Sequence, residues 1–323
     1  MKKVFVAAID RRKKSMYITM LSICFLLVTC PFFINSYFLS LLTQVLIFGI
    51  LAMSLDILIG YGGMVSFNHA TFFGVSGYTV GILFHKGIDN FWLALSAGVF
   101  VSAIFAGILG LIVLRSTGPY FLMMTLAFGQ MFFALAWKWR GLTGGDDGLP
   151  GIPRPDIGIP LSMWENKNFY YLVLFFLCIT FLLLNKILSS RLGKVIMGVR
   201  ESDTRMQALG YNTWLVKYLT YILAACAAGL AGVLNAYYTG FISPQELNWT
   251  TSGLVMLMVI IGGAGTLAGP ISGAAAILVI QNVVSSYTQR WAIIMGVIFI
   301  FCVMYARKGL AGFVGKLYGD KNM

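Results

Sequence analysis

The chain has 323 residues, of which 59% are hydrophobic and only 11% are charged, and its formal net charge is +12 at pH 7. Because soluble domains average about a quarter charged residues, this composition excludes an ordinary soluble protein and predicts an all-α polytopic integral membrane protein with a single transmembrane domain over residues 1–323. The basic residues lie between apolar segments rather than on one face, so they indicate membrane lipid and the positive-inside bias and exclude nucleic acid as a partner.

Residues 1–16 form a basic head that contains six Lys and Arg residues, and an apolar segment at 17–34 follows it. A small-residue cleavage site of the kind that ends a secretory signal peptide does not follow this segment. We therefore expect an uncleaved first span with the N-terminus on the cytoplasmic side.

The remaining chain is a series of apolar segments, and a bilayer core requires about 20 apolar residues per helix. By this length criterion, further spans are predicted at 38–58, 64–84, 91–114, 120–137, 169–188, 214–239, 270–286 and 291–306, with a shorter segment at 252–262. The shorter segment cannot cross alone, so it extends through its flanks or belongs to a broken or re-entrant helix. The prediction is about 8–10 transmembrane helices with glycine-interrupted or re-entrant segments.

The distribution of basic residues predicts the orientation. With both termini inside, 17 Lys and Arg residues lie on the cytoplasmic side and 6 on the outer side. The positive-inside bias favours this orientation over its inverse. It makes 138–168 a periplasmic loop and places 193–217 in the cytoplasm.

Residues 193–217 form a polar interruption between two apolar spans and carry six charged side chains. Apolar residues within it, such as Ile196, Val199 and Met206, fall roughly at helical spacing. This pattern predicts a short amphipathic helix that docks a soluble partner. An ordinary solvated cytoplasmic loop is the alternative.

Two glycine clusters, at 60–63 and 262–265, interrupt apolar segments. Glycine weakens a helix by about 1 kcal/mol relative to Ala, and breaks inside a bilayer are tolerated where protein or a water-filled cavity covers them. Paired glycine-interrupted segments mark the substrate region of transporters, whereas two tight cytoplasmic turns are the alternative. The candidate glycines of a translocation path are Gly60, Gly62, Gly63, Gly262, Gly263 and Gly265.

Three polar residues near the first cluster join this candidate path. Asp56 is the one carboxylate inside a predicted span, and a charge near the centre of a span costs at least about 2.5 kcal/mol. Asp56 therefore faces a cavity or a partner, or lies near the inner end of the span and reaches headgroup water. Asn68 and His69 begin the next span, where a lone histidine is more often a hydrogen-bonding residue of helix packing than a proton relay.

The sequence lacks the patterns that catalysis would need. It contains two histidines, no HExxH or GxSxG motif and no P-loop, so the chain cannot bind ATP by a P-loop of its own. Its five cysteines stand singly in apolar segments without metal-ligand spacing. We expect no enzyme activity, no metal and no cofactor in this chain.

Several segments together resemble the membrane permease subunits of bacterial branched-chain amino acid ABC transporters of the LivM type. These segments keep the order of that family and fall within residues 40–312: Leu58–Gly74, Leu142–Leu149, Gly198–Asp203, Ala208–Gly210, Ala228–Gly232, Phe241–Leu247 and Gly262–Pro270. The resemblance implies a subunit of the inner membrane that moves branched-chain amino acids by ATP-driven alternating access. It also implies a second related permease, two cytoplasmic ATPases that hold ATP and Mg²⁺, and a periplasmic or lipid-anchored substrate-binding protein.

The resemblance assigns residues 193–217 to a cytoplasmic coupling loop seated in a groove of the ATPase. The implied coupling residues are Arg200, Glu201, Asp203, Arg205, Ala208, Leu209 and Gly210. One departure is Asp56, where similar sequences often have Asn, and it puts a strictly family-typical substrate in doubt. Urea, short amides or other amino acids are alternative substrates. An ion-coupled secondary transporter that uses Asp56 and His69 is the alternative mechanism.

Overall fold

The structure is a computed structural model that describes residues 27–158 and 162–287, together with isolated positions between 293 and 300. The predicted basic head lies outside the described residues, as do most of the predicted first and last spans. Among the described residues, six helical segments are long and apolar enough to cross a membrane: α2 with the π-helical turn η2 (Ser36–Tyr61), α4 (Phe91–Val113), α5 (Pro119–Lys138), α7 (Asn166–Ser189), α10 (Thr213–Thr239) and α12 (Gly269–Tyr287).

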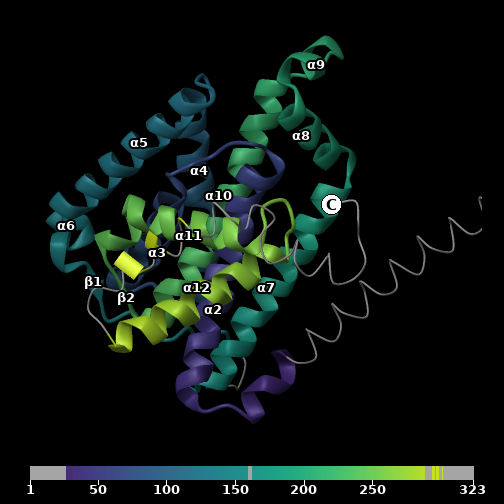
Figure 1. The fold of residues 1–323 in the computed structure, drawn as a ribbon. Helices are drawn as coiled ribbons and strands as arrows, with labels where there is room; N and C mark the ends of the chain where they lie inside the picture. Colours follow the sequence, from purple (N-terminus) through teal and green to yellow (C-terminus); the bar gives the residue numbers. More distant parts are fainter. Residues whose placement is uncertain (1–26, 159–161, 288–292, 295, 298–299, 301–323) are drawn as a thin grey trace, which may run out of the picture.

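Shorter elements connect these long helices (Figure 1). They are η1 (Cys30–Phe32), α3 (His69–His85), α6 (Arg140–Thr143), η3 (Gly145–Asp147), β1 (Leu149–Pro150), α8 (Arg191–Glu201), α9 (Asp203–Ala208), β2 (Phe241–Ile242), η4 (Pro244–Leu247) and α11 (Trp249–Gly262). Each long helix begins and ends within three residues of a predicted span. The all-α polytopic fold is thereby confirmed.

The most buried long helices are α2 and α10, which pack against each other at the centre of the bundle. Helix α10 also packs against α3 and α4, and α2 packs against α7 and α12. Small residues allow this close approach: a Cβ on Gly232 of α10 would overlap the carbonyl oxygen of Phe73 of α3. The Ser102 hydroxyl of α4 donates to the Ala225 carbonyl of α10 at 2.8 Å. Helix α5 is the least buried of the six.

The predicted short segment at 252–262 is helical, and a non-helical stretch precedes it. Helix α11 has 14 residues and is therefore about 21 Å long, which is less than the roughly 30 Å of a bilayer core. The chain before it runs antiparallel to α3 through β2 and η4. Ile242 lies beside Gly77, Leu247 lies beside Gly74, and the Ser252 hydroxyl accepts the Ala70 N–H at 2.9 Å. The non-helical flank thus continues α11 along the length of α3.

Part of the long segment at 138–168 folds against the start of this non-helical flank. Strand β1 pairs antiparallel with β2, with Leu149 opposite Ile242. Leu149 also lies against α3, because a Cβ on Gly81 would come within 3.0 Å of its Cδ1. Backbone groups of β2 therefore find hydrogen-bond partners inside the protein, as a non-helical stretch at membrane depth requires.

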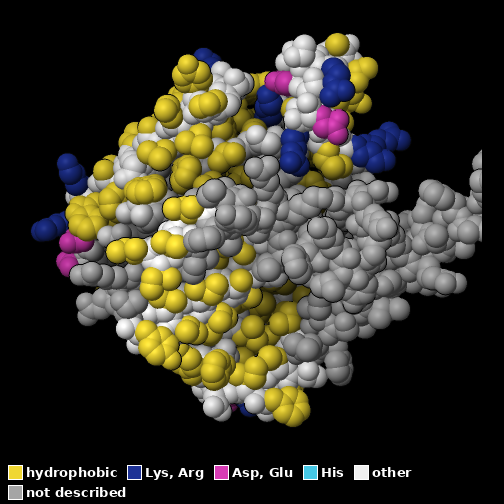
Figure 2. All heavy atoms as spheres, in the orientation of Figure 1, with side chains coloured by type: hydrophobic (Ala, Val, Ile, Leu, Met, Phe, Trp, Pro, Cys, Tyr) yellow, Lys and Arg dark blue, Asp and Glu magenta, His cyan; other side chains and the backbone are white. Residues whose placement is uncertain are grey.

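The predicted polar interruption forms two short helices, α8 and α9, which project beyond the bundle at the top of Figure 1. Figure 2 shows acidic and basic side chains gathered over this projection, while broad apolar surface covers the bundle on the same face. Helix α8 buries Ile196 and Val199 on one side, so the predicted amphipathic helix is present.

Candidate functional site

The two glycine clusters meet at the end of α2, although about 200 residues separate them in the sequence. The Gly265 backbone N–H donates to Oδ1 of Asp56 at 2.7 Å. A Cβ on Gly60 would overlap this same oxygen and the backbone nitrogen of Gly265. Gly265 has a φ of +84°, a conformation that L side chains rarely adopt. The approach of the two chain segments therefore requires glycine at both positions.

Helix α8 reaches this junction through Arg200. The Arg200 guanidinium donates to the carbonyl oxygen of Gly60. Its aliphatic stem lies against Gly63, where an added Cβ would come within 2.9 Å of Cγ of Arg200. One side chain of the polar α8–α9 segment thus holds the backbone of the first glycine cluster, and Asp56 connects that cluster to the second.

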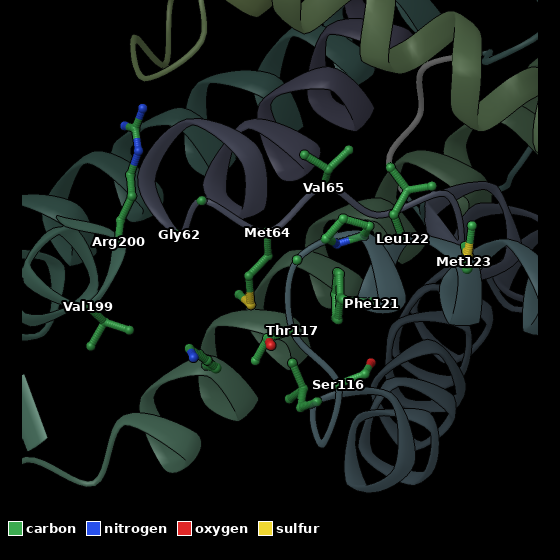
Figure 3. Close-up of a pocket in the computed structure, with 15 residues that line it drawn as sticks. Gly62, Met64, Val65, Ser116, Thr117, Phe121, Leu122, Met123, Val199 and Arg200 are labelled. Atoms are coloured by element: carbon green, nitrogen blue, oxygen red, sulfur yellow. The ribbon is translucent and has the colours of Figure 1, made fainter. Parts of the chain in front are cut away.

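A pocket of about 420 Å³ opens beside the junction. It is enclosed by the chain that follows η2, by the turn between α4 and α5, and by α8 (Figure 3). Most of its wall is apolar, and its lining residues include Gly62, Gly63, Met64, Thr117, Phe121, Val199, Arg200 and Lys217. Arg200 therefore belongs to the glycine junction and to the pocket wall at once.

The other predicted path residues, Asn68 and His69, lie apart from the junction at the start of α3. Both side chains are fully buried. Nε2 of His69 lies 2.7 Å from the Ser54 hydroxyl of α2, and Nδ2 of Asn68 donates to the Tyr221 hydroxyl of α10 at 3.5 Å. His69 thus has the helix-packing contact that was expected of a lone histidine in this place.

The predicted coupling residues occupy α8, α9 and the turn that follows. Glu201, Asp203 and Arg205 lie at the surface or near it, and Leu209 is 72% exposed. The Ser202 hydroxyl caps α9 by accepting the Arg205 N–H at 3.3 Å. Gly210 turns the chain with a φ of +86° toward α10. Ala208 ends α9 beside Leu209 and Gly210, so an apolar residue stands at the tip of a charged projection.

Comparison with known proteins identifies the family of the chain. Residues 37–306 match the family described as branched-chain amino acid transport system, permease component. The chain belongs to this family.

Individual relatives agree with the family match. The LivM permease proteins of the high-affinity branched-chain amino acid transport systems of Salmonella typhimurium and Escherichia coli are 26% identical to the permease over an alignment of 330 positions with gaps. The alignment covers 95% of this chain and 78% of theirs. The LivH permease protein of S. typhimurium is 23% identical over an alignment of 285 positions with gaps, which covers 82% of the permease and 91% of LivH. No solved structure gives a significant match.

These comparisons confirm the resemblance to LivM-type permeases and make the chain a multi-pass membrane transport component. The residues that hold the start of α3 were not predicted. Thr125 of α5 accepts the Phe67 N–H at 3.1 Å, and Ser252 of α11 and Tyr221 of α10 contact the next residues. A hydroxyl inside an apolar span is the signal that could have indicated them, because buried polar groups need partners.

An ion pair stabilises the α8–α9 segment of the permease. Nζ of Lys217 lies 2.6 Å from Oδ2 of Asp203, whose side chain is 38% exposed. Burial by itself would raise the pKa of Asp203, but hydrogen bonds with Lys217 and Thr213 and the charge of Lys217 together outweigh it and hold this pKa below its ordinary value of 3.8. A depressed folded-state pKa gives stability that is present above the unfolded value and is lost as the pH falls through the folded value.

Replacing Asp203 by Asn should therefore weaken α9 only slightly, because exposed ion pairs contribute about 0.2–1 kcal/mol. We expect amide hydrogen exchange in α9 to accelerate by less than about fivefold. The difference in exchange rate between the variant and the wild type should be constant above about pH 5. It should vanish only below pH 3.8, because the folded-state pKa of Asp203 lies below that value. Glu201→Gln is the matched control, since Glu201 forms no ion pair within the described part of the chain. Equal acceleration by both variants would contradict a specific role for the Lys217 pair.

Proposed function

We propose that the permease is the membrane subunit of an ABC importer that moves branched-chain amino acids across the bacterial inner membrane by ATP-driven alternating access. The observation that carries the proposal is the contact of Arg200 with Gly60 in a member of this family. It connects a projecting polar segment, suited to docking, with the glycine breaks inside the bundle. The family description and the names of the relatives support branched-chain amino acids as substrate.

The proposed assembly has the partners that ATP-driven import requires. Two cytoplasmic ATPases bind ATP and Mg²⁺ and receive the α8–α9 segment, because this chain has no P-loop. A second related permease completes the membrane unit, as the two names LivM and LivH among the relatives suggest. A periplasmic or lipid-anchored binding protein delivers the substrate. Both termini lie in the cytoplasm, and 138–168 lies on the periplasmic side.

Coupling follows from the contacts of Arg200 and Asp56. When ATP draws the partner ATPases together, α8 moves with them and Arg200 pulls the Gly60 carbonyl. The bond from Gly265 to Asp56 transmits the shift to the turn between α11 and α12. The pocket wall contains Arg200 and Gly63, so the same movement changes the pocket through which substrate leaves toward the cytoplasm.

Uptake in a strain that lacks its own branched-chain importers tests this function. Cells that express the permease with its second permease, ATPases and binding protein should accumulate labelled leucine. Isoleucine and valine should compete, urea should not, and uptake should disappear when the ATPases are omitted. Competition by urea would assign the alternative substrate. Uptake that persists without ATPases and follows an ion gradient would assign a secondary transporter.

A further inference from the structure

Three oxygen atoms of the α3 start converge on Gly129 of α5. A Cβ built on Gly129 would lie 3.4 Å from Oδ1 of Asn68, 3.5 Å from the carbonyl oxygen of Phe67 and 3.7 Å from Oγ1 of Thr71. Asn68 and Thr71 are fully buried. Within the described residues, neither Oδ1 of Asn68 nor Oγ1 of Thr71 has a hydrogen-bond partner. Buried polar atoms without partners are rare and require an explanation.

The surrounding hydrogen bonds hold these oxygens in place. The bond from Nδ2 of Asn68 to Tyr221 directs its Oδ1 toward α5. The bond from the Phe67 N–H to Thr125 fixes the adjoining backbone. Helices α5 and α10 thus hold the segment in which Oδ1 of Asn68 and Oγ1 of Thr71 lack a hydrogen-bond partner within the described residues. This is an arrangement in which a ligand can supply the missing donors.

The site and the pocket share helix α5. Gly129 is close to the centre of α5, and substrate sites of transporters lie near the bilayer midplane. Phe121 of the same helix lines the pocket. Eight residues of helix separate the two, which is about 12 Å. Helix α5 is the least buried long helix, so it can move away from α3 and admit a ligand at the cost of the bond between Thr125 and the Phe67 N–H.

We propose that Asn68, the Phe67 carbonyl and Thr71 form a binding site for the α-ammonium group of the transported amino acid, opposite Gly129. An ammonium group has three N–H donors, and three acceptor oxygens face the same side of Gly129 here. All three oxygens are uncharged, so the group is held without a buried ion pair that would slow its release. The site rests on the proposed function, since it presumes an amino acid as substrate.

Two variants remove the site without disturbing the fold. Thr71→Val deletes a hydroxyl that has no partner, so the melting temperature should stay the same or rise. Gly129→Ala places a methyl group among the three oxygens at ordinary contact distances of 3.4–3.7 Å. Thr71→Ser keeps the hydroxyl. Gly49→Ala is the matched control, because its Cβ meets only Ile271 and Leu177, also at 3.5–3.7 Å.

The test is the initial rate of leucine uptake by the complete complex in proteoliposomes, with saturating ATP and loaded binding protein. Thr71→Val and Gly129→Ala should reduce this rate at least about tenfold, the effect of losing one hydrogen bond to a charged group. Thr71→Ser and Gly49→Ala should stay within about twofold of the wild type. Melting temperatures should not fall in any of the four variants.

Each contrary outcome has a distinct meaning. Wild-type rates for Thr71→Val and Gly129→Ala, in a complex that transports leucine, would overturn the ammonium site alone. A wild-type complex that transports urea but no leucine would overturn the proposed function and the site with it. A lowered melting temperature of Thr71→Val would make its hydroxyl structural. Loss of wild-type uptake when sodium is replaced by N-methylglucamine would assign the oxygens to an inorganic cation and overturn the proposal.

Discussion

Leu209→Asp should abolish binding of the partner ATPases to the permease and stop transport, while insertion and folding persist. Leu209 is 72% exposed at the tip of the α8–α9 projection. Truncation of an apolar residue that anchors the centre of an interface costs about 2 kcal/mol or more, which corresponds to roughly a 30-fold loss of affinity. A carboxylate in its place adds the free energy of desolvating an unpaired charge. Because Leu209 is exposed, the fold does not depend on it.

Co-purification of the ATPases with the tagged permease measures this prediction, and ATP-driven leucine uptake measures its consequence. Leu209→Met is the matched control, since it keeps an apolar side chain of similar volume and should retain both activities. The melting temperature of Leu209→Asp should equal that of the wild type. If the Asp variant still recovers the ATPases in full amount and transports leucine, the tip of α9 is not their docking site.

The bundle and the α8–α9 segment were predictable because their signals are local. A span is recognised from about 20 consecutive apolar residues, and α8 from the helical spacing of Ile196 and Val199. The apolar stretch at 252–262 also indicated by its length that its helix could not cross a bilayer alone. Its continuation by β2 and η4 was not predictable, because strands of two residues have no hydrophobic period to recognise.

The candidate site was predictable only as separate parts. Glycines at 60–63 and 262–265 pointed to breaks, but their contact depends on how α2, α11 and α12 pack together. Nothing near Arg200 in the sequence indicates that its guanidinium binds the Gly60 carbonyl. The oxygens opposite Gly129 illustrate the same limit, since α3 and α5 bring them together from positions about 60 residues apart.

Gly60→Ala should have the largest effect on stability, because the contact at Gly60 involves backbone atoms. The added Cβ would overlap Oδ1 of Asp56 and the backbone nitrogen of Gly265, and it would lie 2.7 Å from the Gly265 Cα. Relief requires α2 and the turn after α11 to separate. This movement breaks the bond from Gly265 to Asp56 and displaces the carbonyl that Arg200 holds. Such overpacking costs about 3 kcal/mol or more when backbone must move.

The melting temperature of the purified permease should therefore fall by roughly 6–12 °C, and leucine uptake should be lost. Gly253→Ala is the matched control, because this glycine is also in a membrane helix and its Cβ would meet only the Phe67 ring at 3.8 Å. Removing the Asp56 side chain as well, in Gly60→Ala/Asp56→Ala, should not restore transport, since the overlap with the Gly265 backbone remains. Full recovery in that double variant would place the conflict at the carboxylate alone and contradict the backbone contact between the two glycine clusters.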